Sequence, residues 1–199
     1  MTISTPSIPG RPGALRRVVS HDGGMAAVEF ALILPILVVL WIGGVEVTQA
    51  LSVDRRLNNL ASAIGDLTAR SKTMCYAKID AIFDIAPGAL EPFSTNGLGM
   101  RVSAVDVDDD GDAKVAWTRA EGPIPTGAYQ VNGSMNAVVP ESLRVPDSQI
   151  IMAEAYYTYQ PAVGYVITGE IELDDRMFFV PRLTQFVTLV SNNDDGCQT

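Results

Sequence analysis

One apolar stretch near the amino terminus constrains this chain more than any other feature. Residues 25–44 form a run of twenty residues in which Glu29 is the only charged side chain. An α-helix rises about 1.5 Å per residue, so a helix of this length covers the roughly 30 Å hydrocarbon core of a bilayer. The sequence therefore predicts a membrane-spanning helix over residues 25–44, with a carboxylate near its start.

Glu29 requires an explanation, because inserting a charged side chain into hydrocarbon costs several kcal/mol, about 2.5–3.5 kcal/mol on the lenient scales. It lies four residues after Met25. A cut after Gly24 would make Met25 a new amino terminus, whose ammonium group could neutralise the carboxylate one helical turn away. Alternatively, Glu29 lies at the level of the lipid headgroups and stays ionised without a partner. The residues alone leave both interpretations open.

The distribution of charge predicts the orientation of the span. The formal net charge is −9, but residues 1–24 carry three arginines against one aspartate, which leaves −11 for residues 25–199. Basic residues that precede a span hold that end in the cytoplasm. We therefore expect a cytoplasmic leader over residues 1–24 and an exported acidic portion. An acidic domain without basic clusters excludes nucleic acid as a partner.

The chain has two cysteines, Cys75 and Cys197, and the expected topology exports both. In an oxidising compartment an even pair indicates a disulfide first, which here ties the start of the exported region to its last residues. The alternatives are two unpaired thiols, or an intermolecular bridge through Cys197.

A helical pattern continues beyond the apolar run. Apolar residues spaced by four, three, four and three positions follow it: Val53, Leu57, Leu60, Ile64 and Leu67. No proline interrupts residues 36–86, so the sequence predicts one helix from about Met25 to Ser71, with an amphipathic stalk over residues 45–72. Pro35 removes one backbone hydrogen bond within the span. The apolar stripe covers the chain's own globular domain, packs between subunits, or does both.

Residues 73–199 have a different pattern. A short helix is expected over residues 77–86, where Pro87-Gly88 ends it. Five β-rich runs follow: residues 100–107 and 113–119, which an Asp/Gly turn joins into a hairpin, then residues 150–160, 164–173 and 176–190. Helices that come early and strands that come late, without alternation, predict an α+β fold with an antiparallel sheet.

Catalytic chemistry has little support in the sequence. The only histidine is His21, in the leader, so the exported domain cannot form a Ser-His or Cys-His pair. We therefore expect a protein that is not an enzyme and needs no cofactor; a membrane-bound hydrolase is the weakest alternative.

One segment partly matches a calcium-binding loop. Residues 106–111 fit the first six positions of an EF-hand, with Asp106, Asp108 and Asp110 as candidate ligands. Trp117 stands where the bidentate glutamate belongs, and the flanks are strand-like rather than helical. A hairpin turn in which Asp-Gly supplies the positive φ is the favoured interpretation.

The segment from Gly24 through Glu29 and Phe30 to Pro35 resembles the amino-terminal signature of the TadE/TadG-like pseudopilins of tight-adherence (Tad) type IV pilus systems. The Glu-Phe pair and the following proline are its specific part. The resemblance covers about residues 23–72, and more weakly the strand run that ends at residue 161.

The resemblance implies a single-pass protein of the bacterial inner membrane, with a pilin-like exported domain in the periplasm. It implies cleavage by a prepilin peptidase between Gly24 and Met25, with Glu29 as the assembly carboxylate in a segment that includes Phe30 and Pro35. The implied role is that of a minor pseudopilin in pilus assembly, surface adherence and biofilm formation. Its partners would be other pilins and pseudopilins and proteins of the assembly platform. The leading alternative is an uncleaved, membrane-anchored periplasmic binding or structural module.

Overall fold

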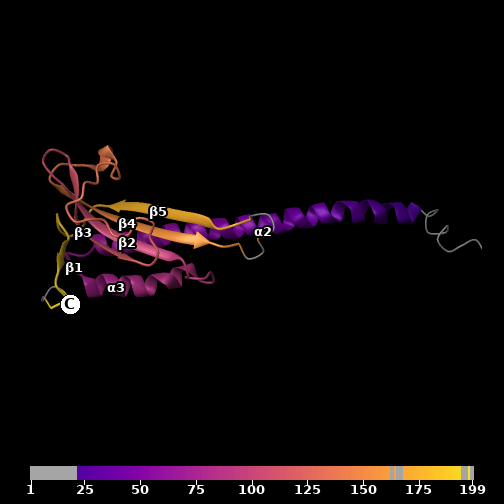
Figure 1. Ribbon diagram of the computed structural model, residues 1–199, viewed down its shortest axis with the longest axis horizontal. Helices are drawn as coiled ribbons and strands as arrows, with labels where there is room; N and C mark the ends of the chain where they lie inside the picture. Colours follow the sequence, from indigo (N-terminus) through magenta and orange to yellow (C-terminus); the bar gives the residue numbers. More distant parts are fainter. Residues whose placement is uncertain (1–21, 162–163, 165–167, 194–196, 198–199) are drawn as a thin grey trace, which may run out of the picture. The chain divides into compact units, whose positions relative to one another are not determined.

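The computed structural model describes residues 22–161, 164, 168–193 and 197 (Figure 1). It divides into two compact units, and the boundary in the sequence falls between Val45 and Glu46. The first helix, α2, runs from Asp22 to Ala69 and comprises 48 residues. This confirms the single long helix predicted from about Met25 to Ser71. The leader predicted over residues 1–24 lies outside the described residues up to position 21, and its last three residues are helical.

The first unit is the apolar part of α2. Pro35 lies inside the helix, and the helix continues through it. By length and composition, the segment is apolar enough to cross a membrane. Its large apolar side chains are exposed along its length and include Val28, Phe30, Leu32, Ile36, Leu40 and Trp41. Among residues 24–45, no side chain of this unit is buried.

The second unit is built on a four-stranded antiparallel sheet in the order β3-β2-β4-β5. Its strands are β2 (Leu98–Val107), β3 (Ala113–Glu121), β4 (Ser148–Tyr159) and β5 (Ile171–Phe179). The predicted hairpin of β2 and β3 is confirmed, and Gly111 in its turn has a φ of 82°. The α+β class with an antiparallel sheet is confirmed as well.

The carboxyl-terminal part of the chain differs from its prediction. Two strands were expected over residues 164–173 and 176–190, but β5 bridges the gap between them, and residues 180–187 are not in a strand. A short strand, β6 (Thr188–Val190), pairs in parallel with β1 (Thr73–Cys75) to form a second, two-stranded sheet. Three-residue strands have too few residues to show alternation, which is why the sequence did not predict this pair.

The part of α2 in the second unit packs its apolar stripe into the core on one face of the sheet. Val53, Leu57, Leu60 and Ile64 are each at most 2% exposed, as the stripe predicts. Leu67 was expected to join them but is 46% exposed, and Thr68 is buried in its place. A straight helix repeats every 3.6 residues rather than every 3.5, so the buried face shifts by one position over this distance.

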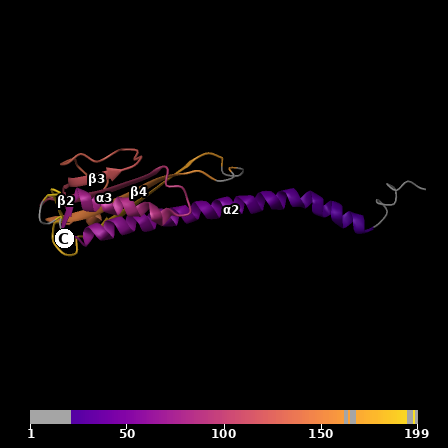
Figure 2. The same ribbon diagram turned by 90° about the horizontal axis from the view of Figure 1, so that it is seen from below.

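Other segments complete both faces of the sheet (Figure 2). Helix α3 (Tyr76–Ile85) adds Ile79 and Phe83 to the same core as α2, and a 3₁₀ turn, η1 (Ala86–Leu90), follows it. The long connection between β3 and β4, which contains η2 (Glu141–Leu143), covers part of the opposite face. There its Met135 and Val139 form a second core with side chains of β2, β3 and β4: Val105, Val107, Val115, Ile150 and Met152.

Candidate functional site

The first candidate site is the start of α2, where the sequence-predicted residues share one helix. Gly24 and Met25, the two residues of the candidate cleavage bond, both lie in helical backbone. Met25 is 72% exposed, and Glu29 is exposed one turn further on. Residues four apart lie on the same side of a helix, so Met25 and Glu29 are neighbours on its surface. Phe30 and Pro35 continue the segment.

This surface is suited to association with other apolar surfaces. It presents a nearly continuous apolar surface with one carboxylate, and it has no nucleophile-and-base pair. In a low-dielectric setting a single carboxylate strongly favours a cationic partner, because an unpaired charge there is costly. The geometry can therefore fix the register of a helix against a partner that carries a positive charge.

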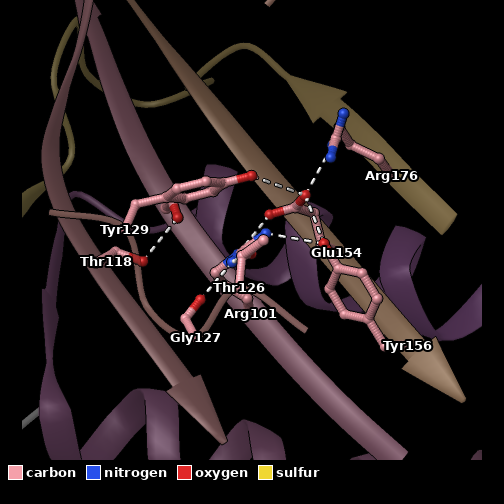
Figure 3. A network of polar contacts seen from close by, with 9 residues as sticks. Arg101, Thr118, Thr126, Gly127, Tyr129, Glu154, Tyr156 and Arg176 are labelled. Carbon is pink, nitrogen blue, oxygen red and sulfur yellow. Dashed lines mark hydrogen bonds and ion pairs between the residues drawn. The ribbon is translucent and has the colours of Figure 1, made fainter. Parts of the chain in front are cut away.

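The second candidate site is a buried polar cluster on the sheet, which the sequence did not predict (Figure 3). Arg101 on β2 and Glu154 on β4 are register partners, and their side chains are 0% and 1% exposed. The Arg101 Nε donates to Glu154 Oε2 at 2.6 Å. From the neighbouring strand β5, Arg176 Nε donates to Glu154 Oε1 at 2.7 Å. One carboxylate, on the middle of three adjacent strands, thus binds a guanidinium group from the strand on each side.

Two tyrosines complete the cluster. Tyr156 accepts a hydrogen bond from Arg101 Nη2 at 2.8 Å, and its hydroxyl donates to Glu154 Oε1 at 3.1 Å. Tyr129, from the long loop, donates to the same oxygen at 3.3 Å, and its ring lies 3.7 Å from the Arg101 guanidinium carbon. The cluster therefore satisfies its buried polar groups, as their burial requires.

Arg101 also anchors the loop over the sheet. Its Nη1 donates to Thr126 Oγ1 at 2.8 Å and to the carbonyl oxygen of Gly127. Close packing fixes the loop beside this contact, because a Cβ on Gly99 would lie only 2.2 Å from the Pro123 carbonyl oxygen. The cluster thus holds the loop segment of residues 123–129 against β2 and β4.

The electrostatics of the cluster follow from burial and from its two arginines. Burial alone would raise the pKa of the Glu154 carboxyl, but the hydrogen bonds and charges of Arg101 and Arg176 outweigh it and hold that pKa below its usual range. Burial, together with the nearby Glu154 charge, raises the pKa of Tyr156 to about 12. Glu154 is therefore ionised and Tyr156 neutral at physiological pH. Two cations against one anion leave the cluster with a net charge of +1.

Individual charges within the apolar strand runs were the available sequence signal for this cluster. Arg101 and Glu154 each interrupt a run of mostly apolar strand residues, and a charge in such a position needs a buried partner. They lie 53 positions apart in the sequence, so identifying them as partners requires the strand register.

The two cysteines form the predicted disulfide. Cys75 and Cys197 are bonded, with their Cα atoms 5.9 Å apart. Cys75 is the last residue of β1, and Cys197 follows shortly after β6, so the bond reinforces the parallel strand pair. The expectation of an intramolecular bond is confirmed.

The three aspartates considered as candidate calcium ligands do not converge on one site. Asp106 accepts a hydrogen bond from Gln149, and Asp108 forms an ion pair with Lys114 at 2.8 Å. Asp110 belongs to the turn that precedes Gly111. The hydrogen bond from Lys114 lowers the pKa of Asp108, and the backbone amide of Asp112 adds to the effect. Within the described residues, no group of three or more His, Cys, Asp or Glu side chains is arranged to hold a metal ion.

Comparison with known proteins finds a family match over α2. Residues 24–65 match the family described as TadE-like protein, which confirms the resemblance found in the sequence. The match begins at Gly24, and it includes the exposed apolar segment and most of the buried stripe of α2. No curated protein and no solved structure matched the chain.

Proposed function

We propose that this chain is a minor pseudopilin of a Tad-type pilus assembly system, which acts by helix-mediated assembly and not by catalysis. The observation that carries the proposal is the TadE-like match over residues 24–65, on a helix whose first part exposes its apolar side chains. That surface needs a membrane or other helices to cover it. The proposed role places the protein in the inner membrane, with its second unit in the periplasm.

In this proposal, a prepilin peptidase cuts between Gly24 and Met25. The new ammonium group at Met25 lies one helical turn from Glu29. Glu29 then pairs with an amino terminus, its own or a neighbour's, and sets the register of one subunit against the next in the low-dielectric environment. The partners are other pilins and pseudopilins and the proteins of the assembly platform.

Cleavage is tested on protein extracted from the membranes of two strains, one with an active prepilin peptidase and one without. Intact mass and amino-terminal sequencing should show a chain that begins at Met25 only in the first strain, and Gly24→Ala should abolish the cut. An intact leader in the strain with active peptidase would instead favour the uncleaved, membrane-anchored module.

Assembly is tested separately with Glu29. We expect Glu29→Ala to leave processing largely intact but to reduce piliation and the co-purification of other pilus subunits. Val28→Ala, a substitution at the adjacent exposed apolar position, is the matched control and should assemble normally. Normal piliation in the Glu29→Ala strain would contradict the role of this carboxylate.

A further inference from the structure

The two edges of the four-stranded sheet differ in how they are covered. At the start of β3, loop residues 132–135 bond to the strand: Asn132 N–H donates to the Val115 carbonyl, and Met135 N–H donates to that of Ala113. At the other edge, β5 pairs with β4 from Ile171 to Phe179. In the part of the chain that the structure describes, no further backbone hydrogen bond reaches β5. Its outer backbone groups are available to another strand (Figure 1).

β5 is an ordered edge, because one of its faces is anchored. Ile171, Leu173, Met177 and Phe179 pack against the core that α2 shares. On the other face Arg176 is fixed by Glu154. A strand held from both faces does not need to become ordered when a partner binds, which lowers the entropic cost of association.

A groove lies on one face of the sheet, between β5 and the loop over β4. It has a volume of about 560 Å³, and Tyr156 and Thr158 of β4, Glu172, Asp174 and Arg176 of β5, and the loop segment 123–125 contribute to its lining. The buried cluster maintains its shape, because Arg101 holds the following loop residues Thr126 and Gly127. The groove therefore has a preformed wall on one side and an open strand on the other.

The charge of β5 indicates what kind of segment would bind at this edge. Its four charged side chains sum to −2, and Glu172 and Asp174 project from the same face as alternate residues. Arg176 lies on the same face two positions after Asp174, and its Nε is bonded to Glu154. Alternate residues of a strand lie about 6.6–6.8 Å apart on one face, the spacing at which an added strand presents its own alternate side chains. Pairing with a second copy of β5 would bring two strands of charge −2 together, which disfavours that occupant.

We propose that the open edge of β5 and the adjoining groove bind an extended segment of a partner protein by strand addition, with Lys or Arg at two alternate positions opposite Glu172 and Asp174. The main-chain hydrogen bonds supply affinity, and the two carboxylates select a basic segment. This interaction does not depend on cleavage after Gly24 or on assembly through Glu29, so it can fail while the proposed function stands.

The test uses the full-length protein in detergent micelles and a fluorescent, end-capped peptide of alternating lysine and valine. We expect the peptide to bind and to protect amides of β5 from hydrogen exchange. The double variant Glu172→Gln, Asp174→Asn should bind about tenfold more weakly, since it loses two cross-strand charge pairs. The control double variant Glu91→Gln, Glu141→Gln removes two exposed carboxylates outside the groove and should bind within about twofold of the parent.

A second peptide separates strand pairing from simple charge attraction. It has the same sequence with alternate backbone nitrogens methylated along one edge, which blocks the main-chain bonds and keeps the charge. Equal binding of this peptide, equal loss in both double variants, or protection away from β5 would overturn the proposal. So would a protein that sediments as a dimer and does not bind the lysine peptide, because a second copy would then occupy the edge.

Discussion

The two parts of α2 belong to one continuous helix, but large apolar side chains are mostly exposed in the first part and form a buried stripe in the second. Before Val45 the large apolar residues are exposed; after it, Val53, Leu57 and Ile64 are buried against the sheet. The same contrast holds for carboxylates, because Glu29 lies on an exposed helix and Glu154 lies buried between two arginines. In the second unit the fold itself covers the apolar side chains and provides counter-charges for the buried carboxylate. In the first unit the surroundings of the helix must do both.

Removing a buried carboxylate from the second unit and an exposed one from the first should give the largest difference in the free energy of unfolding. Glu154→Gln leaves the Arg101 guanidinium, which is 0% exposed, without its counter-charge, and we expect a loss of about 3–5 kcal/mol in the free energy of unfolding. Chemical denaturation in detergent micelles, followed by tryptophan fluorescence, measures it. Glu29→Gln should change that free energy by less than about 0.5 kcal/mol.

Asp80→Asn is the control for removing any carboxylate from an arginine pair. Asp80 binds Arg119 at 2.9 Å with both side chains 39% exposed, so its loss should cost about 0–1 kcal/mol. Equal losses in the Glu154 and Asp80 variants would show that burial does not distinguish these pairs.

Truncating one leucine in each unit is the next comparison. Leu57→Ala creates a cavity in the core and should lower the free energy of unfolding by about 2–5 kcal/mol. Leu37→Ala removes a side chain that is 48% exposed, and it should change the same quantity by less than about 0.5 kcal/mol. A large effect of Leu37→Ala on the unfolding of the sheet would mean that the two units unfold together.

The disulfide should contribute slightly less to the free energy of unfolding than the Leu57 side chain does. Replacing Cys75 and Cys197 together by serine removes a cross-link between residues 122 positions apart, and we expect a loss of about 2–4 kcal/mol. Thermal unfolding of the second unit, measured with and without a reductant, checks this value. The parent protein in reductant should behave like the double variant, and the helical signal of residues 22–45 should be unchanged in both.

pH should have the smallest effects on stability, and the predicted ones come from Glu154 and Tyr156 of the second unit. The pKa of Glu154 is lowered in the folded state, so its contribution to stability is present above the pKa of an unfolded glutamate, about 4.3, and is lost as the pH falls through the lower folded value. The pKa of Tyr156 is raised to about 12, so stability should also decline as the pH rises above about 10.

Titration followed by ultraviolet absorbance separates the ionisation of Tyr156 from that of the other groups. Tyr156→Phe should remove the contribution of one tyrosine to the phenolate absorbance that develops near pH 12. An unchanged titration curve in this variant would contradict the raised pKa.

The sequence predicted the parts of the fold that depend on local patterns. The absence of proline over residues 36–86 and the apolar spacing predicted α2, and the Asp-Gly pair predicted the hairpin turn. The pairing of Arg101 with Glu154 and that of β1 with β6 depend on distant segments meeting in a particular register. Short-range periodicity carries no information about either, so both had to come from the structure.

The disulfide also determines which part of the chain bears a mechanical load. Cys75 directly precedes α3, and the covalent ring that it closes with Cys197 contains every strand of the four-stranded sheet. A tension applied between α2 and the chain after Cys197 passes through the sulfur–sulfur bond instead of through the hydrogen bonds of that sheet. The sheet, with its open edge and groove, is therefore shielded from a pull along the chain for as long as the bond remains oxidised.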